Sequence, residues 1–162
     1  MQISKAVATL MGAQIGHELG ASHQYLQVAT YFDNLAFKKL AEFFYKQSAE
    51  EREHAMKFVH FLTETGVDVK IPAVAAPKYE IASAEAAFQM SLEWEMEVTR
   101  QIHAMVDQAA KDKDFASHSF LQWYVDEQVE EVSTMETMLE IVKRAGEKNL
   151  LMVEAYLIHE AA

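Results

Sequence analysis

Polar side chains with metal-binding chemistry recur in stretches that otherwise have the pattern of buried helix faces. They are Glu18, the Glu51-x-x-His54 pair, Glu95 and the Gln128-x-x-Glu131 pair. Glu18 precedes Glu51 by 33 residues, and Glu95 precedes Gln128 by the same number. Four helices that each direct oxygen or nitrogen donors into one core are typical of a dinuclear metal site in a helix bundle.

The cost of burying these carboxylates indicates that they hold cations. An ionised carboxylate in an apolar stripe costs several kcal/mol unless something compensates it, and converging carboxylates also repel one another. His54 is the only side chain among these residues that can carry a positive charge. Several carboxylates and one imidazole suit iron or manganese, and zinc competes for the same donors. The i, i+3 spacing places Glu51 and His54 on one helix face, where Glu51 could bridge two metals.

The elements that must position these residues are four long helices and a short fifth. The helical patterns cover about 4–34, 37–65, 83–110 and 114–145, and a shorter helix is expected over 147–162. Gly66 is placed to end the second helix, while Ser83 and Asp114 are placed as N-caps of the third and fourth. Pro72 and Pro77 exclude a helix from the intervening segment 67–82.

The lengths of the connections predict the order in which the helices pack. Two short turns make the first and second helices, and the third and fourth, into antiparallel hairpins. The middle connection, at about 16 residues, is long enough to run the length of the bundle. The second and third helices are therefore expected to be parallel, in an all-α four-helix bundle with one long crossover. Both hairpins would then place their metal-binding residues at mid-height.

Each long helix has an inward stripe at i, i+3/i+4, i+7 spacing. The first comprises Met11, Ile15, Glu18, Ser22, Tyr25, Ala29 and Phe32. The second comprises Leu40, Phe44, Gln47, Glu51, His54, Phe58 and Phe61. The third comprises Phe88, Leu92, Glu95, Thr99, Ile102 and Val106, and the fourth Leu121, Tyr124, Gln128, Glu131, Met135, Met138 and Val142.

Composition narrows the class of protein. The 162 residues are expected to form one domain, 1–162, with the bundle over about 4–145 and the short helix over 147–160. The net charge of −11 argues against nucleic-acid binding. The absence of cysteine excludes disulfides, zinc–thiolate sites and iron–sulfur clusters. No apolar run is long enough to span a membrane, and the apolar start continues in helical register, so we expect a cytoplasmic protein.

Two segments carry a resemblance to a known family. The strings Gln47-Ser-Ala-Glu-Glu-Arg-Glu-His54 and Phe120-Leu-Gln-Trp-Tyr-Val-Asp-Glu-Gln-Val-Glu-Glu131 are similar to diagnostic segments of the bacterial-type non-haem ferritins. The resemblance covers nearly the whole chain and implies a ferritin-like fold. It also implies an iron-storage protein with ferroxidase activity, which oxidises Fe(II) with dioxygen or hydrogen peroxide.

The resemblance further implies roles for individual residues. One iron lies between Glu18, Glu51 and His54, and a second is held by Glu51, Glu95 and Glu131. Gln128 lines the side where oxygen binds. Tyr25 lies beside the two irons, where it donates a hydrogen bond or one electron; the alternative is a tyrosine that only packs in the core.

Further implications concern iron beyond this pair and the assembly. Glu50, Glu127 and Glu130 match a third iron site, for which the alternative is a solvated acidic face. The family forms a hollow homo-oligomeric shell of twenty-four subunits. The short helix after Gly146 is compatible with a helix that packs around a four-fold axis, or with one folded back over its own bundle.

Departures from the related families favour this interpretation. Haem-binding bacterioferritins place methionine after the first ligand of E-x-x-H, where this chain has Arg52, so no haem is expected. Rubrerythrin-type peroxidases usually carry a cysteine-ligated iron domain. Mini-ferritins take ligands from the first two helices only. A passive shell subunit is the remaining alternative, and subunits of that kind lose the buried ligands that this chain keeps. The other six histidines are expected at surface or satisfied core positions.

Overall fold

The computed structural model describes residues 3–160, in which all regular structure is helical. The long helices are α1 (Lys5–Asn34), α2 (Lys38–Glu64), α3 (Ala84–Lys111) and α4 (Phe115–Ala145). A single 3-10 turn, η1 (Glu147–Asn149), then leads into α5 (Leu150–Glu160). The all-α bundle with a short fifth helix is confirmed. The expected helix over 147–162 begins with this tighter turn, and its last two positions lie outside the described residues.

The helix ends follow the predicted capping residues. The Ser83 hydroxyl accepts a hydrogen bond from the Ala86 N–H at 2.9 Å, and the Asp114 carboxylate accepts one from the Ser117 N–H at 3.1 Å. Gly66 follows α2 with a φ of +84°, a left-handed conformation that glycine adopts without strain. These caps provide partners for backbone groups that a helix terminus leaves unpaired.

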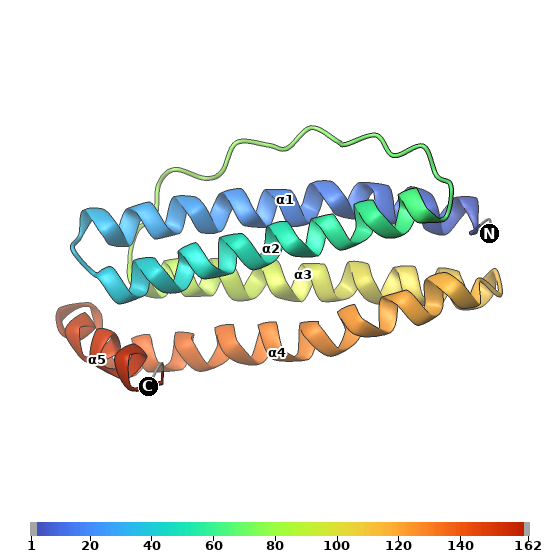
Figure 1. The fold of residues 1–162 in the computed structure, drawn as a ribbon. Coiled ribbons are helices and arrows are strands. Elements are labelled where there is room, and N and C mark those ends of the chain that lie inside the picture. The colour runs from blue at the N-terminus through green and yellow to red at the C-terminus, as the bar shows by residue number, and fades with distance from the viewer. Residues whose placement is uncertain (1–2, 161–162) are drawn as a thin grey trace.

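The connection over residues 67–82, here called the strap, runs along the outside of the bundle beside α1 (Figure 1). It brings the chain back to the starting end of α2, so α2 and α3 run in the same direction, as predicted. The Gln24 side chain fixes the strap to α1, because its amide pairs with both the N–H and the C=O of Lys78, at 2.8 and 3.2 Å. Gly16 lets the strap approach closely, since a Cβ there would lie 2.8 Å from the Pro72 ring.

Two apolar clusters fill the bundle, one at each end of its long axis. One contains Phe32, Phe44 and Phe88, and the other contains Phe58 and Tyr124, whose rings stack at 4.2 Å. The predicted inward stripes of α1 and α4 are buried throughout. Those of α2 and α3 needed correction.

On α2, Leu62 is buried where Phe61 was expected, and Phe61 lies half-buried against Phe120. On α3 half of the expected stripe is wrong, because Leu92, Thr99 and Val106 are only half-buried. The buried positions are instead the residues immediately before them, Ser91, Val98 and Met105. Phe88, Glu95 and Ile102 are buried as predicted, and the residues that complete the buried face lie three positions after each of them, whereas the prediction took those four positions after.

The C-terminal segment packs across one end of the bundle and caps two of its helices (Figure 1). The Glu147 carboxylate accepts hydrogen bonds from the first N–H groups of α3, those of Ala84 and Glu85, at 3.2 and 3.0 Å. The Glu154 carboxylate accepts one from the Leu40 N–H of α2 at 2.7 Å. In the part of the chain that is described, no helix is both long enough and apolar enough to cross a membrane.

Candidate metal centre

The predicted ligands meet at mid-height of the bundle, between its two apolar clusters. Glu18 comes from α1, Glu51 and His54 from α2, Glu95 from α3, and Gln128 and Glu131 from α4. All six side chains are buried, with exposed fractions between 1 and 6%. The bundle therefore brings donors from all four helices into one site within a single subunit.

Three of these residues form a compact group. Glu18, Glu51 and His54 each offer one ligand atom, and these atoms lie within 4.8 Å of one another. The His54 Nδ1 lies 3.5 Å from the Glu51 Oε2. The Glu18 Oε2 is buried without a hydrogen-bond partner among the described residues. A buried carboxylate oxygen is costly in that state, and a bound cation would supply the missing partner.

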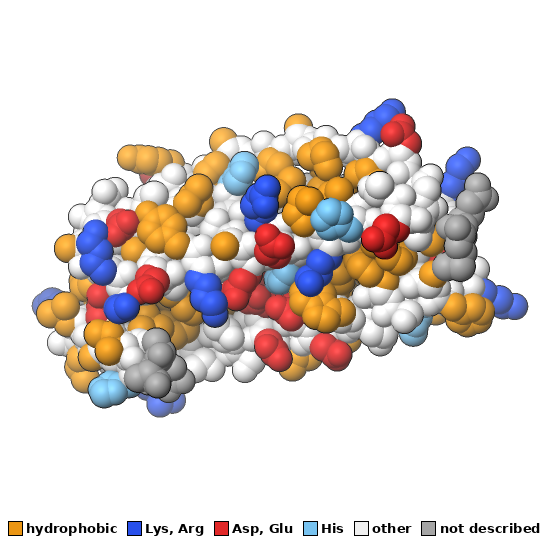
Figure 2. All heavy atoms as spheres, in the orientation of Figure 1, with side chains coloured by type: hydrophobic (Ala, Val, Ile, Leu, Met, Phe, Trp, Pro, Cys, Tyr) orange, Lys and Arg blue, Asp and Glu red, His pale blue; other side chains and the backbone are white. Residues whose placement is uncertain are grey.

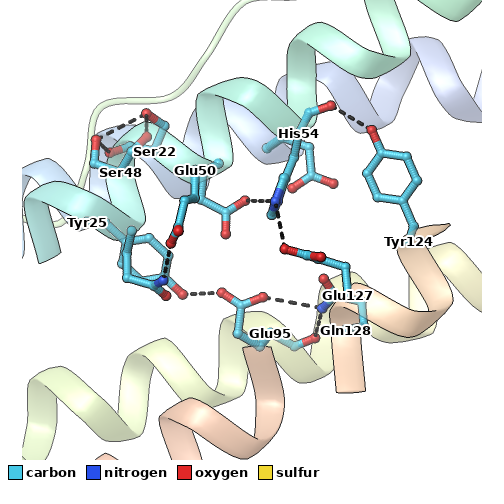
Figure 3. A network of polar contacts seen from close by, with 12 residues as sticks. Ser22, Tyr25, Ser48, Glu50, His54, Glu95, Tyr124, Glu127 and Gln128 are labelled. Atoms are coloured by element: carbon cyan, nitrogen blue, oxygen red, sulfur yellow. Dashed lines mark hydrogen bonds and ion pairs between the residues drawn. The ribbon is translucent and has the colours of Figure 1, made fainter. Parts of the chain in front are cut away.

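A second group shares His54 with the first. His54, Glu127 and Glu131 also offer one ligand atom each within 4.8 Å, and the His54 Nε2 lies 3.4 Å from the Glu127 Oε1. The imidazole thus has one carboxylate near each of its two nitrogens (Figure 3). The resemblance had placed Glu127 with Glu50 and Glu130, apart from His54.

Glu50 and Glu130 lie farther out. Glu50 is half-buried and accepts a hydrogen bond from the Gln47 amide at 2.7 Å, while Glu130 is exposed. Within residues 3–160, neither belongs to a group of three potential ligands with the 4.8 Å spacing. Figure 2 shows that acidic side chains gather half-way along this face of the bundle. The third iron site therefore stays a prediction.

Glu95 lies opposite these groups, held by residues of α1 and α4 (Figure 3). The Tyr25 hydroxyl donates a hydrogen bond to the Glu95 Oε1. The Gln128 amide donates to the Glu95 Oε2 at 3.3 Å and to the Glu95 backbone oxygen at 3.1 Å. The structure thus places both predicted catalytic residues, Tyr25 and Gln128, on one carboxylate.

The electrostatics of the site are those of a cluster of acids lacking compensating charge. Burial raises the pKa of Glu18 and of Glu51 well above the usual range, and the nearby carboxylates raise both further. Burial likewise raises the pKa of Glu95, and it raises the pKa of Glu131 to about 8. Protons therefore occupy part of the site when it holds no metal, and divalent cations would displace them.

Hydrogen bonds outside the ligand set fix the helices that carry it. The Ser22 hydroxyl donates to the Ser48 backbone oxygen at 2.7 Å, and the Ser48 hydroxyl donates to the Ser22 oxygen at 2.8 Å. This reciprocal pair joins α1 to α2 one helical turn from Glu18. The Tyr124 hydroxyl donates to the His54 backbone oxygen at 2.7 Å and joins α4 to α2.

Sequence reasoning missed Gln14, which is 2% exposed and donates from its Nε2 to the Glu18 Oε1 at 3.0 Å. Its position four residues before Glu18 was an available signal, because i and i+4 side chains meet on a helix. Tyr124 was predicted only as a core residue, and no local pattern indicates its bond to the His54 backbone, which is 70 residues away in sequence.

Comparison with known proteins agrees with this geometry. A family model described as a ferritin-like domain matches residues 9–145. The bacterial non-heme ferritin of Staphylococcus aureus strain USA300 is 38% identical over 145 residues, which cover 90% of this chain and 87% of that protein. The corresponding protein of Staphylococcus haemolyticus is 37% identical with the same coverage.

Comparison with solved structures also finds ferritins. An open pore ferritin from the hyperthermophilic archaeon Archaeoglobus fulgidus superposes with a TM-score of 0.92 and 39% identity, covering 96% of each chain. A humanized archaeal ferritin superposes with a TM-score of 0.92 and 36% identity, covering 96% of this chain and 97% of the other. The family match, the curated relatives and the superpositions each span most of the bundle, and the chain belongs to the ferritin family.

Proposed function

We propose that this protein stores iron and oxidises it at the buried centre before storage. Its substrates are two ferrous ions per subunit and a molecule of dioxygen or hydrogen peroxide. The observation that carries this proposal is the convergence of four buried glutamates and one histidine from four helices. Their oxygen-rich donor set suits iron, and carboxylate oxygens are hard ligands that favour the ferric state.

The electrons and protons of the proposed reaction balance between the two ferrous ions and the oxidant. Each ferrous ion gives up one electron, and dioxygen accepts two electrons and two protons to become hydrogen peroxide. If hydrogen peroxide is the oxidant, it accepts two electrons and two protons, its O–O bond breaks, and two waters form. Two metal ions about 3.5–4 Å apart allow both electrons to pass in one encounter.

Within this proposal the ligands divide between two neighbouring positions. Glu18, Glu51 and His54 bind the first ferrous ion, and Glu51, Glu95 and Glu131 bind the second. The second group in the structure adds a detail, because Glu127 lies where it can accept a hydrogen bond from the His54 Nε2. A carboxylate in that place orients the imidazole and makes its Nδ1 a better ligand.

Tyr25 and Gln128 act on the second position through Glu95. The Tyr25 hydroxyl is buried against that carboxylate, and its aromatic ring is a source of one electron if a single iron is oxidised alone. The Gln128 amide donates to the Glu95 Oε2 at 3.3 Å and so helps to hold this carboxylate. Its proposed second role, from the resemblance, is to line the side where oxygen binds.

Storage requires an enclosed volume, which we propose is a homo-oligomeric shell of twenty-four subunits. Glu50, Glu127 and Glu130 lie at the border between the centre and the surface and offer carboxylates to departing ferric ions. A passive shell subunit would also store iron but would not accelerate its oxidation.

The test is aerobic addition of two ferrous ions per subunit to metal-free protein, with ferric absorbance followed from milliseconds to seconds. A fast phase that saturates near two ions per subunit is expected. Oxidation at the rate of the buffer alone would overturn the oxidase assignment, and a passive store would then explain any slow uptake of iron.

A further inference from the structure

The two carboxylate oxygens of Glu18, a proposed metal ligand, differ in their hydrogen bonding. The Gln14 Nε2 donates to the Glu18 Oε1 at 3.0 Å. The other oxygen, Oε2, is buried and has no hydrogen-bond partner in the described structure. The Glu18 carboxylate offers a ligand atom within 4.8 Å of those of Glu51 and His54. One oxygen of Glu18 is therefore held by protein, and the other is left for a cation.

The orientation of the Gln14 amide is itself fixed by a chain of polar groups that reaches the outer surface. The His17 Nδ1 lies 3.4 Å from the Gln14 Oε1 and 2.8 Å from the Gln101 Oε1. Both neighbours are oxygens, so this nitrogen must carry the hydrogen and donate. The Gln101 amide is oriented in turn, because its Nε2 donates to the Glu97 Oε1 at 2.9 Å.

The hydrogen bonds of this chain lead away from His17 on both sides. The His17 N–H faces the oxygens of both glutamines, so the Gln14 NH₂ group faces Glu18 and the Gln101 NH₂ group faces Glu97. His17 thereby fixes the orientation of the Gln14 amide beside the buried carboxylate of α1. A leucine at position 14 would fill the same volume without any of these bonds.

We propose that Gln14 is a positioning residue that keeps Glu18 a one-oxygen ligand of the first metal position, and that His17 and Gln101 hold Gln14 in the orientation this requires. The inference rests on the proposed metal centre. Hydrogen-bonded neighbours of metal ligands commonly change metal affinity by about 10–100-fold when they are removed. The effect should be confined to the position that Glu18 serves, because within residues 3–160 Gln14 makes no hydrogen bond to another predicted ligand.

The test compares Gln14→Leu with Gln24→Leu. Gln24 is a matched control, since it is a buried glutamine of the same helix with amide hydrogen bonds, and these go to the strap. Zn²⁺ is the probe, because it does not change oxidation state. Crystals of each protein soaked in Zn²⁺ report which Glu18 oxygens bind the ion, and calorimetry reports the affinity of each position.

In the unaltered protein and in Gln24→Leu, Zn²⁺ is expected to bind through one Glu18 oxygen. In Gln14→Leu, Glu18 is free to rotate and is expected to bind through both oxygens, with affinity at the first position lowered at least about tenfold. The second position should be unchanged. One-oxygen binding with unaltered affinity in Gln14→Leu would overturn the proposal, as would an equal loss at both positions.

A second variant, His17→Leu, tests the outer part of the chain at an exposed position where the fold is not at risk. His17→Leu should also lower the Zn²⁺ affinity of the first position, by a smaller factor than Gln14→Leu. Zinc binding identical to that of the unaltered protein would remove His17 from the proposal. Failure of the unaltered protein to bind Zn²⁺ at this site would instead refute the metal centre itself.

Discussion

Both carboxylate oxygens of Glu95 accept hydrogen bonds, one from the Tyr25 hydroxyl and one from the Gln128 amide. Glu95→Ala should therefore remove a proposed ligand and leave the buried Tyr25 hydroxyl without its acceptor, while the Gln128 amide keeps its hydrogen bond to the backbone oxygen of residue 95. We expect the helical fold to persist and the fast phase of iron oxidation to slow at least about tenfold.

Stopped-flow absorbance measures that phase, and circular dichroism checks the fold. Glu93→Ala is the matched control, since Glu93 is an exposed glutamate of the same helix. A fast phase of unchanged rate in Glu95→Ala would remove Glu95 from the centre.

The buried acids also predict how stability depends on pH. Burial raises the pKa of Glu131 to about 8, from 4.5 for a free side chain. Between these values the folded protein binds a proton that the unfolded chain does not. The stabilisation is complete below pH 4.5 and is lost as the pH rises through 8, by up to about 5 kcal/mol for this group. Burial raises the pKa of Glu18 and Glu51 too, which adds to the same trend.

Metal-free protein should therefore show a falling midpoint of thermal unfolding between pH 5 and pH 8, and Glu131→Gln should flatten the decline. Saturating Zn²⁺ should oppose the decline, because metal ions bind the deprotonated ligands more tightly as the pH rises. A midpoint that climbs over the same range in metal-free protein would contradict the electrostatic description of the site.

At the scale of the elements, substitution by alanine at two glycines of α1 is expected to change stability in opposite directions. A Cβ at Gly16 would lie 2.8 Å from the Pro72 ring, whereas one at Gly12 would meet nothing within 4 Å. Gly16→Ala should displace the strap and cost about 1–3 kcal/mol. Gly12→Ala should stabilise the protein by up to about 1 kcal/mol, because alanine favours a helix interior.

Denaturant midpoints of the two variants, compared with the unaltered protein, measure both effects. If both alanines proved stabilising, the strap would have to be held more loosely on α1 than the Pro72 contact and the Gln24 hydrogen bonds indicate.

The first turn of α2 depends on a residue from the other end of the chain. The residue before α2, Phe37, makes no side-chain cap, and the Leu40 N–H donates to Glu154 instead. Glu154→Ala should cost about 1 kcal/mol and speed hydrogen exchange at the Leu40 amide. Glu136→Ala, at an exposed glutamate of α4, is the control. Exchange at Leu40 that is equally slow in both variants would show that this cap contributes nothing.

These caps illustrate what the sequence could predict. Ser83 and Asp114 were recognisable because a cap residue and its helix are adjacent in sequence. Glu147 and Glu154 were not, because they reach N–H groups 62 to 114 residues away. The buried carboxylates of the proposed centre were predictable because they interrupt an apolar stripe. The contact of Glu127 with His54 was missed, because it joins α4 to α2 and no local pattern shows which α4 side chain faces His54. The position of Glu127 four residues before Glu131 was an available signal that the two share a helix face.

For the molecule as a whole, the notable surface is that of α5, which exposes large apolar side chains although Leu150 and Val153 are buried. Leu151 is 75% exposed and Met152 is 68% exposed, although both are apolar. Exposed apolar side chains on one short helix suit contacts between copies in the proposed shell. Leu151→Asp should reduce the assembled fraction, measured by light scattering, while Leu151→Met should not. Full assembly of Leu151→Asp would show that this side chain lies outside the subunit contacts.

The division of the ligands between two hairpins has a consequence for a newly made chain. The hairpin of α1 and α2 supplies Glu18, Glu51 and His54, and the hairpin of α3 and α4 supplies the remaining donors after the strap has been made. In the proposed centre, neither half alone supplies the ligands of both irons. A nascent or broken subunit would therefore lack the proposed means to generate hydrogen peroxide from dioxygen, and this hazardous chemistry would begin only when the tertiary structure is complete.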